Sequence, residues 1–218
     1  MIKENKKKLI LTSVVTLLPI LIGLLLWNKL PEQVPTHWNA AGEVDGWSSR
    51  AFAVFGLPCF LFAIHWICLL VTSADPKKQN IQGKPLNIVF WICPFVSLLC
   101  AALTYGTALG AEFKVDKILP LFMGALFIVL GVYLPKCKQN YTVGIKLPWT
   151  LNDEENWNKT HKLAGTVWIV GGVAFFFLIF VPASFMTIAV LFIALVITTI
   201  PVVYSYLLYS QADKKEED

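Results

Sequence analysis

The sequence predicts an all-α integral membrane protein with six transmembrane helices and both termini in the cytoplasm. Three observations lead to this prediction. The 218 residues are 56% apolar with a mean hydropathy of +0.64, which is too apolar for an ordinary soluble domain. Charged residues are few and cluster between long uncharged runs. Basic residues are divided unevenly between alternate loops, which indicates the orientation in the membrane.

The first four apolar runs each have the length of one membrane span. They cover residues 9–28, 51–74, 86–111 and 118–134. A run without any charge follows, from 164 to 212. As one helix, these 49 residues would be roughly 70 Å long at about 1.5 Å per residue, whereas the hydrocarbon core is about 30 Å thick. This run therefore predicts two spans, joined by a turn at 182–184.

Six spans place both termini on the same side of the membrane. Fourteen of the 18 Lys and Arg residues lie on that side. Lys29, Arg50, Lys114 and Lys117 lie on the other. Because basic residues favour cytoplasmic loops, the termini and the stretch 135–163 are predicted to be inside, and the loop 29–50 outside. The same distribution explains the net charge of +4, so a nucleic-acid partner is not predicted.

The predicted outer loop, residues 29–50, is rich in turn-forming and aromatic residues. Turns are predicted at 40–42 and 45–46, which would make the loop a compact cap. One interpretation is a binding surface for an extracellular molecule, and the other is a folded loop anchored by its Trp residues. The candidate binding residues are His37, Trp38, Asn39, Gly42, Asp45 and Gly46.

The predicted inner stretch, residues 141–163, is the longest polar interval between apolar blocks. Pro148 excludes helix just before it. Thr150 is then expected to cap a helix with Asp153 at the third position, a variant of the capping box. The result would be an interfacial helix near 153–163 with Trp157 and His161 on one face. Glu155 and Lys159 are spaced to form an i, i+4 ion pair.

This inner stretch has three interpretations. It could bind a cytoplasmic protein, His161 could transfer protons, or the segment could be purely structural. Within the spans, His65 is an intramembrane polar candidate. No disulfide framework, metal site or cofactor is predicted, because four of the five Cys lie in apolar runs and no Cys-x-x-Cys occurs. Gly106-x-x-x-Gly110 and Gly171-Gly172 have spacings that permit close helix contact.

Two motifs resemble a known family. GIKLPWTLNDEENWNKTHKLAG at 144–165 resembles the signature of the SdpI family of bacterial membrane proteins. LPEQVPTHWNAAGEVDGWSSR at 30–50 is similar to the DUF1648 segment that often precedes it. The matching motif positions are Gly144, Lys146, Pro148, Trp149, Thr150, Trp157, Thr160 and His161. The family's usual Arg-Thr is Lys146-Leu147 here, which keeps the charge and loses the planar fork of Arg.

The resemblance implies a division into a DUF1648-like region at 1–74, two further spans within 75–134, and an SdpI-like loop with the last two spans at 135–218. It also implies an immunity protein, not an enzyme, in the bacterial cell membrane. The expected partners are a secreted peptide toxin outside, the lipid bilayer, and a cytoplasmic transcriptional repressor through which the protein would signal. Two alternatives stay open: an enzyme acting on a lipid or lipid-linked substrate through a loop histidine, and an envelope homeostasis protein without a dedicated toxin.

Overall fold

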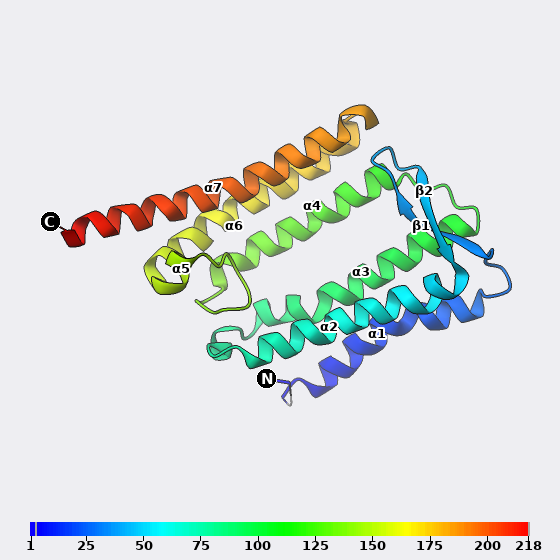
Figure 1. Cartoon of the computed structure of the whole chain (residues 1–218), viewed down its shortest axis with the longest axis horizontal. Helices are drawn as coiled ribbons and strands as arrows, with labels where there is room; N and C mark the ends of the chain where they lie inside the picture. Colours follow the sequence, from blue (N-terminus) through cyan, green and yellow to red (C-terminus); the bar gives the residue numbers. More distant parts are fainter. Residues whose placement is uncertain (3, 218) are drawn as a thin grey trace. The chain divides into compact units, whose positions relative to one another are not determined.

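The computed structural model describes residues 1, 2 and 4–217 (Figure 1). Lys3 and Asp218, which belong to the basic N-terminal segment and the polar tail, lie outside the described residues. The helices are α1 Lys6–Leu25, α2 Leu57–Ala74, α3 Lys84–Ala108, α4 Val115–Tyr133, α5 Pro148–Asn152, α6 Glu154–Phe177 and α7 Ala183–Glu217. The strands are β1 Gln33–Trp38 and β2 Val44–Ser49, and a π-helical turn, Phe52–Gly56, leads into α2.

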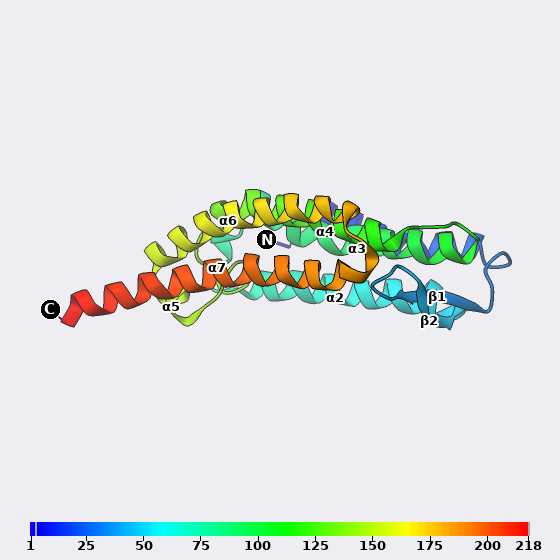
Figure 2. The ribbon, with the colours of Figure 1, turned by 90° about the horizontal axis from the view of Figure 1, so that it is seen from above.

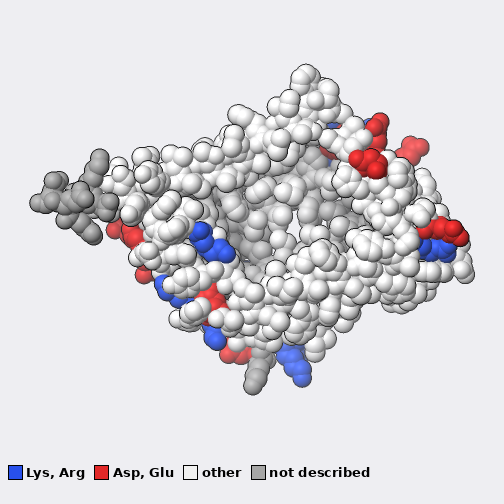
Figure 3. All heavy atoms as spheres, in the orientation of Figure 1, with Lys and Arg blue, Asp and Glu red and all other residues white. Residues whose placement is uncertain are grey.

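Six of the described helical segments are long and apolar enough to cross a membrane, which confirms the predicted number of spans. They run over Lys6–Leu25, Phe52–Ala74, Lys84–Ala108, Val115–Lys136, Glu154–Phe180 and Ala183–Ala212. On the face drawn in Figure 3, charged side chains gather near helix ends and loops, and the middle stretches of the helices carry none. This is the distribution that a bilayer imposes, since a charge at its centre is costly.

The chain forms two compact units. The first comprises Met1–Ser73 and Asn87–Ile118, and the second comprises Ala74–Leu86 and Leu119–Asp218. In the first unit, side-chain hydroxyls hold α1 against α3. The Ser97 hydroxyl donates to the Thr16 carbonyl at 2.7 Å, and the Tyr105 hydroxyl donates to the Pro19 carbonyl at 3.2 Å. Both bonds are buried, where satisfied polar groups fix one packing arrangement.

The predicted cap at 29–50 is a β-hairpin, which the sequence analysis missed. β1 and β2 pair in antiparallel fashion with two irregularities, one between Pro35 and His37 and one between His37 and Trp38. The turn at 40–42 is confirmed, with Gly42 at φ +80°. The predicted turn at 45–46 is wrong, because Gly46 lies within β2 and pairs with His37. A Cβ on Gly46 would lie 2.8 Å from the His37 Cβ. The absence of a side chain at Gly46 therefore allows the two strands to lie close together.

In the second unit, α7 folds back beside α6 (Figures 1 and 2). The chain reverses between a 3-10 turn at Leu178–Phe180 and the start of α7 at Ala183. This reversal confirms the predicted turn at 182–184. The Trp168 indole N–H donates to the Ile197 carbonyl at 3.1 Å, which ties the two helices together midway along α6.

Helices α4 and α6 meet backbone to backbone at two pairs of glycines seven residues apart. A Cβ on Gly124 would lie 2.7 Å from the Gly172 carbonyl oxygen, and one on Gly172 would lie 2.6 Å from the Gly124 oxygen. Gly131 and Gly165 stand in the same reciprocal relation at 2.7 Å. We call these two pairs the glycine seam. Small residues permit such close approach of helices in lipid.

Candidate functional site

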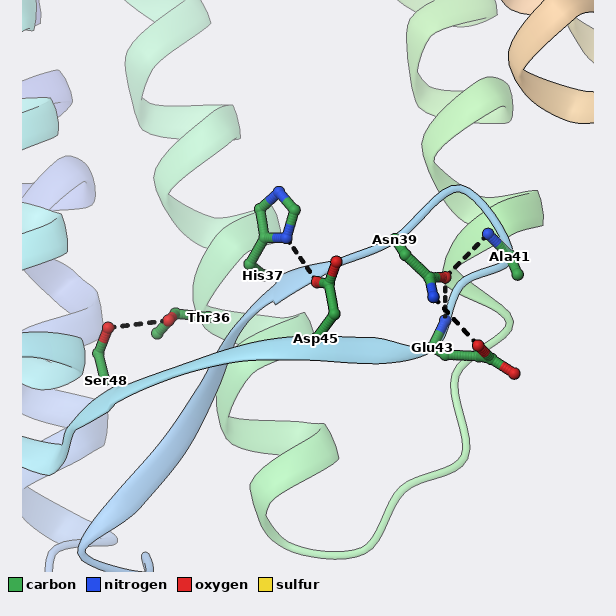
Figure 4. Close-up of polar contacts among 7 residues, drawn as sticks. All are labelled: Thr36, His37, Asn39, Ala41, Glu43, Asp45 and Ser48. Carbon is green, nitrogen blue, oxygen red and sulfur yellow. Dashed lines mark hydrogen bonds and ion pairs between the residues drawn. The ribbon is translucent and has the colours of Figure 1, made fainter.

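The exposed face of the hairpin carries a paired histidine and carboxylate (Figure 4). His37 Nδ1 lies 2.6 Å from Asp45 Oδ1, and the His37 side chain is 72% exposed. The pairing leaves His37 Nε2 as the ring nitrogen available to a ligand. Trp47, two residues after Asp45 on β2, is 57% exposed. Alternation along the strand places Asp45 and Trp47 on the same face.

The other predicted binding residues of the hairpin mostly shape it. The Asn39 side-chain oxygen accepts from the backbone N–H groups of Ala41 and Glu43 at 2.9 and 3.0 Å, so Asn39 organises the turn (Figure 4). Gly42 lies against the first turn of α4, where a Cβ would be 2.8 Å from the Asp116 amide nitrogen. Trp38 is half-buried. Trp47, which was not among the predicted binding residues, presents more apolar surface than Trp38.

The residues between α4 and α6, numbers 137–153, form what we call the motif loop. Its helix caps differ from the prediction. Asp153 is itself the N-cap of α6, accepting from the Glu155 and Asn156 amides at 2.7 and 3.1 Å. Thr150 lies instead in the short helix α5, where its hydroxyl accepts from the Leu147 amide at 2.9 Å. The predicted cap at Thr150 is therefore wrong: the short helix α5 ends at Asn152, and α6 begins directly after it with Asp153 as its N-cap.

The predicted interfacial helix at 153–163 is not a separate element. It is the first part of α6, which continues to Phe177. The predicted ion pair is present, with Lys159 Nζ 2.6 Å from Glu155 Oε1 on the exposed face. Trp157 and His161 share a face as predicted, and their rings stack with centroids 4.0 Å apart.

His161 is buried and fully engaged by hydrogen bonds. Its Nδ1 lies 2.7 Å from the Trp157 carbonyl oxygen, and its Nε2 accepts from the Ile145 amide at 2.9 Å. Because a carbonyl can only accept, Nδ1 carries the proton and the ring is neutral. Gly144 lies on this ring with φ +127°, and a Cβ there would be 2.5 Å from Nε2. In this arrangement His161 holds the motif loop on α6 and has no free nitrogen for acid–base chemistry.

Two further networks fasten the motif loop. The Ser205 hydroxyl of α7 accepts from the Trp149 indole N–H at 2.8 Å and donates to the Asn156 side-chain oxygen at 2.8 Å. Thr160 donates to the same Asn156 oxygen at 3.0 Å. The Trp157 indole N–H donates to the Cys137 carbonyl at 2.7 Å. Five of the motif positions, Trp149, Thr150, Trp157, Thr160 and His161, therefore serve the packing of this loop.

Asp75 and Gln139 are anchors that the sequence analysis did not identify. Asp75, 4% exposed, accepts from the Tyr141 amide at 2.9 Å and the Thr142 hydroxyl at 2.6 Å. Gln139 donates to the Thr150 carbonyl at 2.9 Å and contacts the Lys77 ammonium. Nothing in the local sequence marks either residue, because their partners lie 11 to 67 positions away.

Lys146 and Pro148 are the exposed members of the motif. Both residues belong to a loop whose other motif residues are held by contacts with α6 and α7. The motif loop thus presents a cation and a proline ring on its exposed side. The surrounding exposed groups include Tyr141, which is 49% exposed.

His65 is buried between helices of the first unit. Its Nε2 lies 3.1 Å from the Thr12 hydroxyl, whose proton is directed to the backbone carbonyl of Lys8 or Leu9. His65 Nδ1 has no hydrogen-bond partner among the described residues. No group of three His, Cys, Asp or Glu residues within the described part of the chain is placed to hold a metal ion. The contact between His65 and Thr12 joins α2 to α1.

The fold and the loops define a multi-pass membrane protein with a hairpin between its first two spans and a packed motif loop before its fifth. Comparisons with known proteins add two family matches, each over part of the chain. Residues 136–205 match the SdpI/YfhL protein family, and residues 14–62 match the DUF1648 domain of unknown function. The resemblance drawn from the two motifs is confirmed: an SdpI-family region is preceded by a DUF1648 segment.

A curated relative aligns along nearly the whole chain. The immunity protein SdpI of Bacillus subtilis (strain 168) is 24% identical over 209 residues, which cover 94% of this chain and 97% of the relative. No solved structure matches the chain.

Proposed function

We propose that this protein is a membrane immunity protein that protects a bacterium from a secreted antimicrobial peptide toxin. The observation that carries the proposal is the similarity to the immunity protein SdpI over 94% of this chain, which is too long a match to leave out either loop region. A relative that shared only the spans would support a membrane location and little more. Here the hairpin and the motif loop are both inside the aligned length.

The proposed toxin-binding surface is the hairpin, on the outer side of the membrane. The positive-inside count supports this orientation, with both termini and the motif loop in the cytoplasm. Among the candidate residues, His37 and Asp45 offer exposed polar groups, and Trp47 adds an exposed aromatic ring. Aromatic anchors beside a few polar groups are typical of binding hot spots. Trp38, Asn39, Gly42 and Gly46 act indirectly, by holding the shape of this face.

The proposed cytoplasmic role is signalling, in which the motif loop holds a transcriptional repressor at the membrane. Exposed Lys146 and Pro148 are the direct contacts in this proposal. The role is one of binding and not of catalysis, which agrees with the complete hydrogen bonding of His161. The lipid bilayer surrounds the spans, and no nucleic acid is involved.

The test is survival. The chain is expressed in a toxin-sensitive bacterium that lacks an immunity gene, with the Bacillus subtilis SdpI protein as the positive control. Wild type is compared with His37→Ala and Trp47→Ala at matched membrane levels. Thr36→Ala, which removes a hairpin contact to Ser48 at 2.9 Å, is the matched control. We expect wild type and Thr36→Ala to protect, and the other two variants to protect poorly.

The alternatives give different results. If wild type fails to protect against any toxin to which SdpI gives protection, the immunity proposal is wrong and a homeostasis role takes its place. If protection persists in the hairpin variants but disappears in an exposed-face variant of the motif loop, the toxin-binding assignment is wrong. If His37→Ala abolishes function and Trp47→Ala has no effect, a loop histidine with enzymatic activity becomes the better explanation.

A further inference from the structure

Arg50 stands at the base of the hairpin and is the only arginine among the 18 Lys and Arg residues of the chain. Its backbone N–H, directly after the end of β2, donates to the Glu32 carbonyl at 2.9 Å. Its guanidinium Nη1 donates to the Trp27 carbonyl at 2.8 Å, and the guanidinium carbon lies 5.1 Å from the centre of the Trp27 ring. These two contacts with Trp27 fix the position of the cation at the end of α1.

Capping of α1 uses only part of this side chain. A cation near the last carbonyls of a helix is favourable, but a guanidinium has five N–H donors in a planar fork. The bond to Trp27 takes one of them. Among the described residues, no hydrogen bond or ion pair joins Arg50 to a carboxylate. The half-buried cation therefore keeps donors whose geometry matches an oxyanion such as a phosphate.

The place of Arg50 in the chain puts its guanidinium in the headgroup layer of the bilayer. The first membrane-spanning segment ends at Leu25, two residues before Trp27. The second begins at Phe52, two residues after Arg50. Two residues reach at most roughly 7 Å, and the headgroup layer is about 5–7 Å thick on each side of the hydrocarbon core. The oxyanion that every phospholipid presents at this depth is its phosphodiester.

On the hydrocarbon side of the cation, the surface is aromatic and apolar. The Trp27 ring packs against Phe55 with ring centroids 6.0 Å apart, and Phe55 is 40% exposed. Leu25 and Phe52, at the ends of the two spans, are exposed as well. A cation, an aromatic ring and an apolar surface therefore follow one another from the headgroup layer into the hydrocarbon. This order of polarity is that of a phospholipid molecule.

We infer that Arg50 and Trp27 form a binding site for the phosphate of a phospholipid headgroup, with Phe55 in contact with the acyl chains. The guanidinium fork donates to the phosphate oxygens, and Trp27 holds the fork in place. Because Arg50 also closes the hairpin at Glu32, the bound lipid anchors the base of the hairpin at the membrane surface. The inference applies to either orientation of the chain in the membrane, and it does not depend on the immunity proposal.

The single arginine permits a direct test on the unaltered protein. Isotope-labelled arginine gives one guanidinium carbon signal from the full chain. Solid-state NMR with dipolar recoupling between carbon and phosphorus nuclei then shows whether a phosphorus atom lies within about 4–5 Å of this carbon, as charge-assisted hydrogen bonds of about 2.7–2.9 Å require. We expect this contact in bilayers of phosphatidylglycerol. Absence of the contact overturns the inference.

A second sample separates a lipid phosphate from a free one. The labelled protein is placed in bilayers of digalactosyldiacylglycerol, a lipid without phosphate, with inorganic phosphate in the buffer. We expect the contact between the guanidinium carbon and phosphorus to disappear. If it persists, the site takes a free anion and the lipid assignment is overturned.

Variants test whether the site is specific or whether any cation at the membrane surface would serve. Arg50→Gln removes the charge and the fork, and Lys114→Gln removes one charge from an exposed residue at the same end of the first unit. Native mass spectrometry measures the phosphatidylglycerol that stays bound after release from mixed nanodiscs with phosphatidylcholine. We expect about a 5-fold loss in Arg50→Gln and none in Lys114→Gln. Equal losses in the two variants overturn the inference.

Phe55→Ala covers the case in which Arg50→Gln fails to fold. It removes the ring beside Trp27 and leaves the cation in place. Phe60→Ala, which removes an exposed ring further into the same span, is the matched control. Less bound phosphatidylglycerol in Phe55→Ala than in Phe60→Ala supports the inference, and equal amounts refute it.

Discussion

Replacing His161 by alanine tests whether the histidine of the motif holds the fold or performs chemistry. The ring is 1% exposed and stacks on Trp157. Its loss leaves the Ile145 amide without its acceptor, at a cost of about 1–3 kcal/mol for an unpaired buried donor. The vacated space adds a cavity cost, which for large-to-small core changes is about 2–5 kcal/mol in all. These two costs overlap, and we expect His161→Ala to lower the free energy of unfolding by about 3–5 kcal/mol.

Such a loss is a large part of the total stability of a typical protein, about 5–15 kcal/mol. The expected fall in Tm is roughly 6–20 °C for a chain of this size. Thermal unfolding of the purified protein in nanodiscs measures it directly. The matched variant is His161→Gln, whose side-chain oxygen can accept from the Ile145 amide. A packing role predicts that glutamine recovers part of both the stability and the function.

The reasoning is refuted if His161→Ala unfolds at the wild-type temperature, because the buried hydrogen bonds would then contribute nothing. It is also refuted if His161→Gln is as stable as wild type and yet entirely inactive. That combination would mean that the imidazole does chemistry that an amide cannot, and the enzyme alternative would gain its first support.

Two further predictions concern the membrane region and the orientation. Gly131→Ala is expected to lower the free energy of unfolding by about 1–3 kcal/mol, because overpacking forces two backbones apart. Val132→Ala, on the exposed side of α4, should stay within about 0.5 kcal/mol of wild type. Equal stability of the two variants in thermal unfolding would contradict the close contact at the glycine seam. A membrane-impermeant maleimide is expected to label Gln33→Cys from outside intact cells and Asn152→Cys only after the cells are opened, while native Cys137 stays largely unlabelled because burial raises the pKa of its thiol to about 11. The reverse labelling pattern would show that the orientation is opposite to the predicted one, with the hairpin inside and the motif loop outside.

The six spans were predictable from the sequence because hydropathy requires no knowledge of partners. An uncharged run of 49 residues can only be accommodated by folding back, and Pro182 marked the place. The hairpin was not predictable in the same way. Its strands are six residues each, and Asp45-Gly46 has the composition of a turn. Gly46 is needed in β2 because the His37 Cβ of β1 lies against it. This contact becomes visible only when the pairing of the two strands is known.

The motif loop shows a similar division between local and tertiary information. The face shared by Trp157 and His161 followed from helical spacing, and so did the ion pair of Glu155 with Lys159. The predicted cap at Thr150 was wrong, because Thr and Asp both cap helices and the local sequence does not show that Asp153 takes this place in α6.

The two glycine pairs of the seam could not be predicted from the sequence either. Gly171-Gly172 was noticed as a pattern, but its meaning requires knowing that α4 is the neighbour of α6. Gly106-x-x-x-Gly110 had the same appearance and a different use. Gly106 lies against the Phe113 ring, and Gly110 has φ +94° just after the end of α3.

The burial of the motif residues changes what their presence means. From the sequence alone, a signature made of Trp, Thr, His and Gly suggests a reactive or ligand-binding surface. In the structure these side chains bond to Ile145, Cys137 and Ser205, and they leave Lys146 and Pro148 exposed. Of the positions by which the family is recognised, Lys146 and Pro148 are therefore the exposed ones in this loop, and the others are buried or half-buried. A partner-binding screen should vary the exposed pair first, and variants of the buried set should be interpreted only alongside a stability measurement.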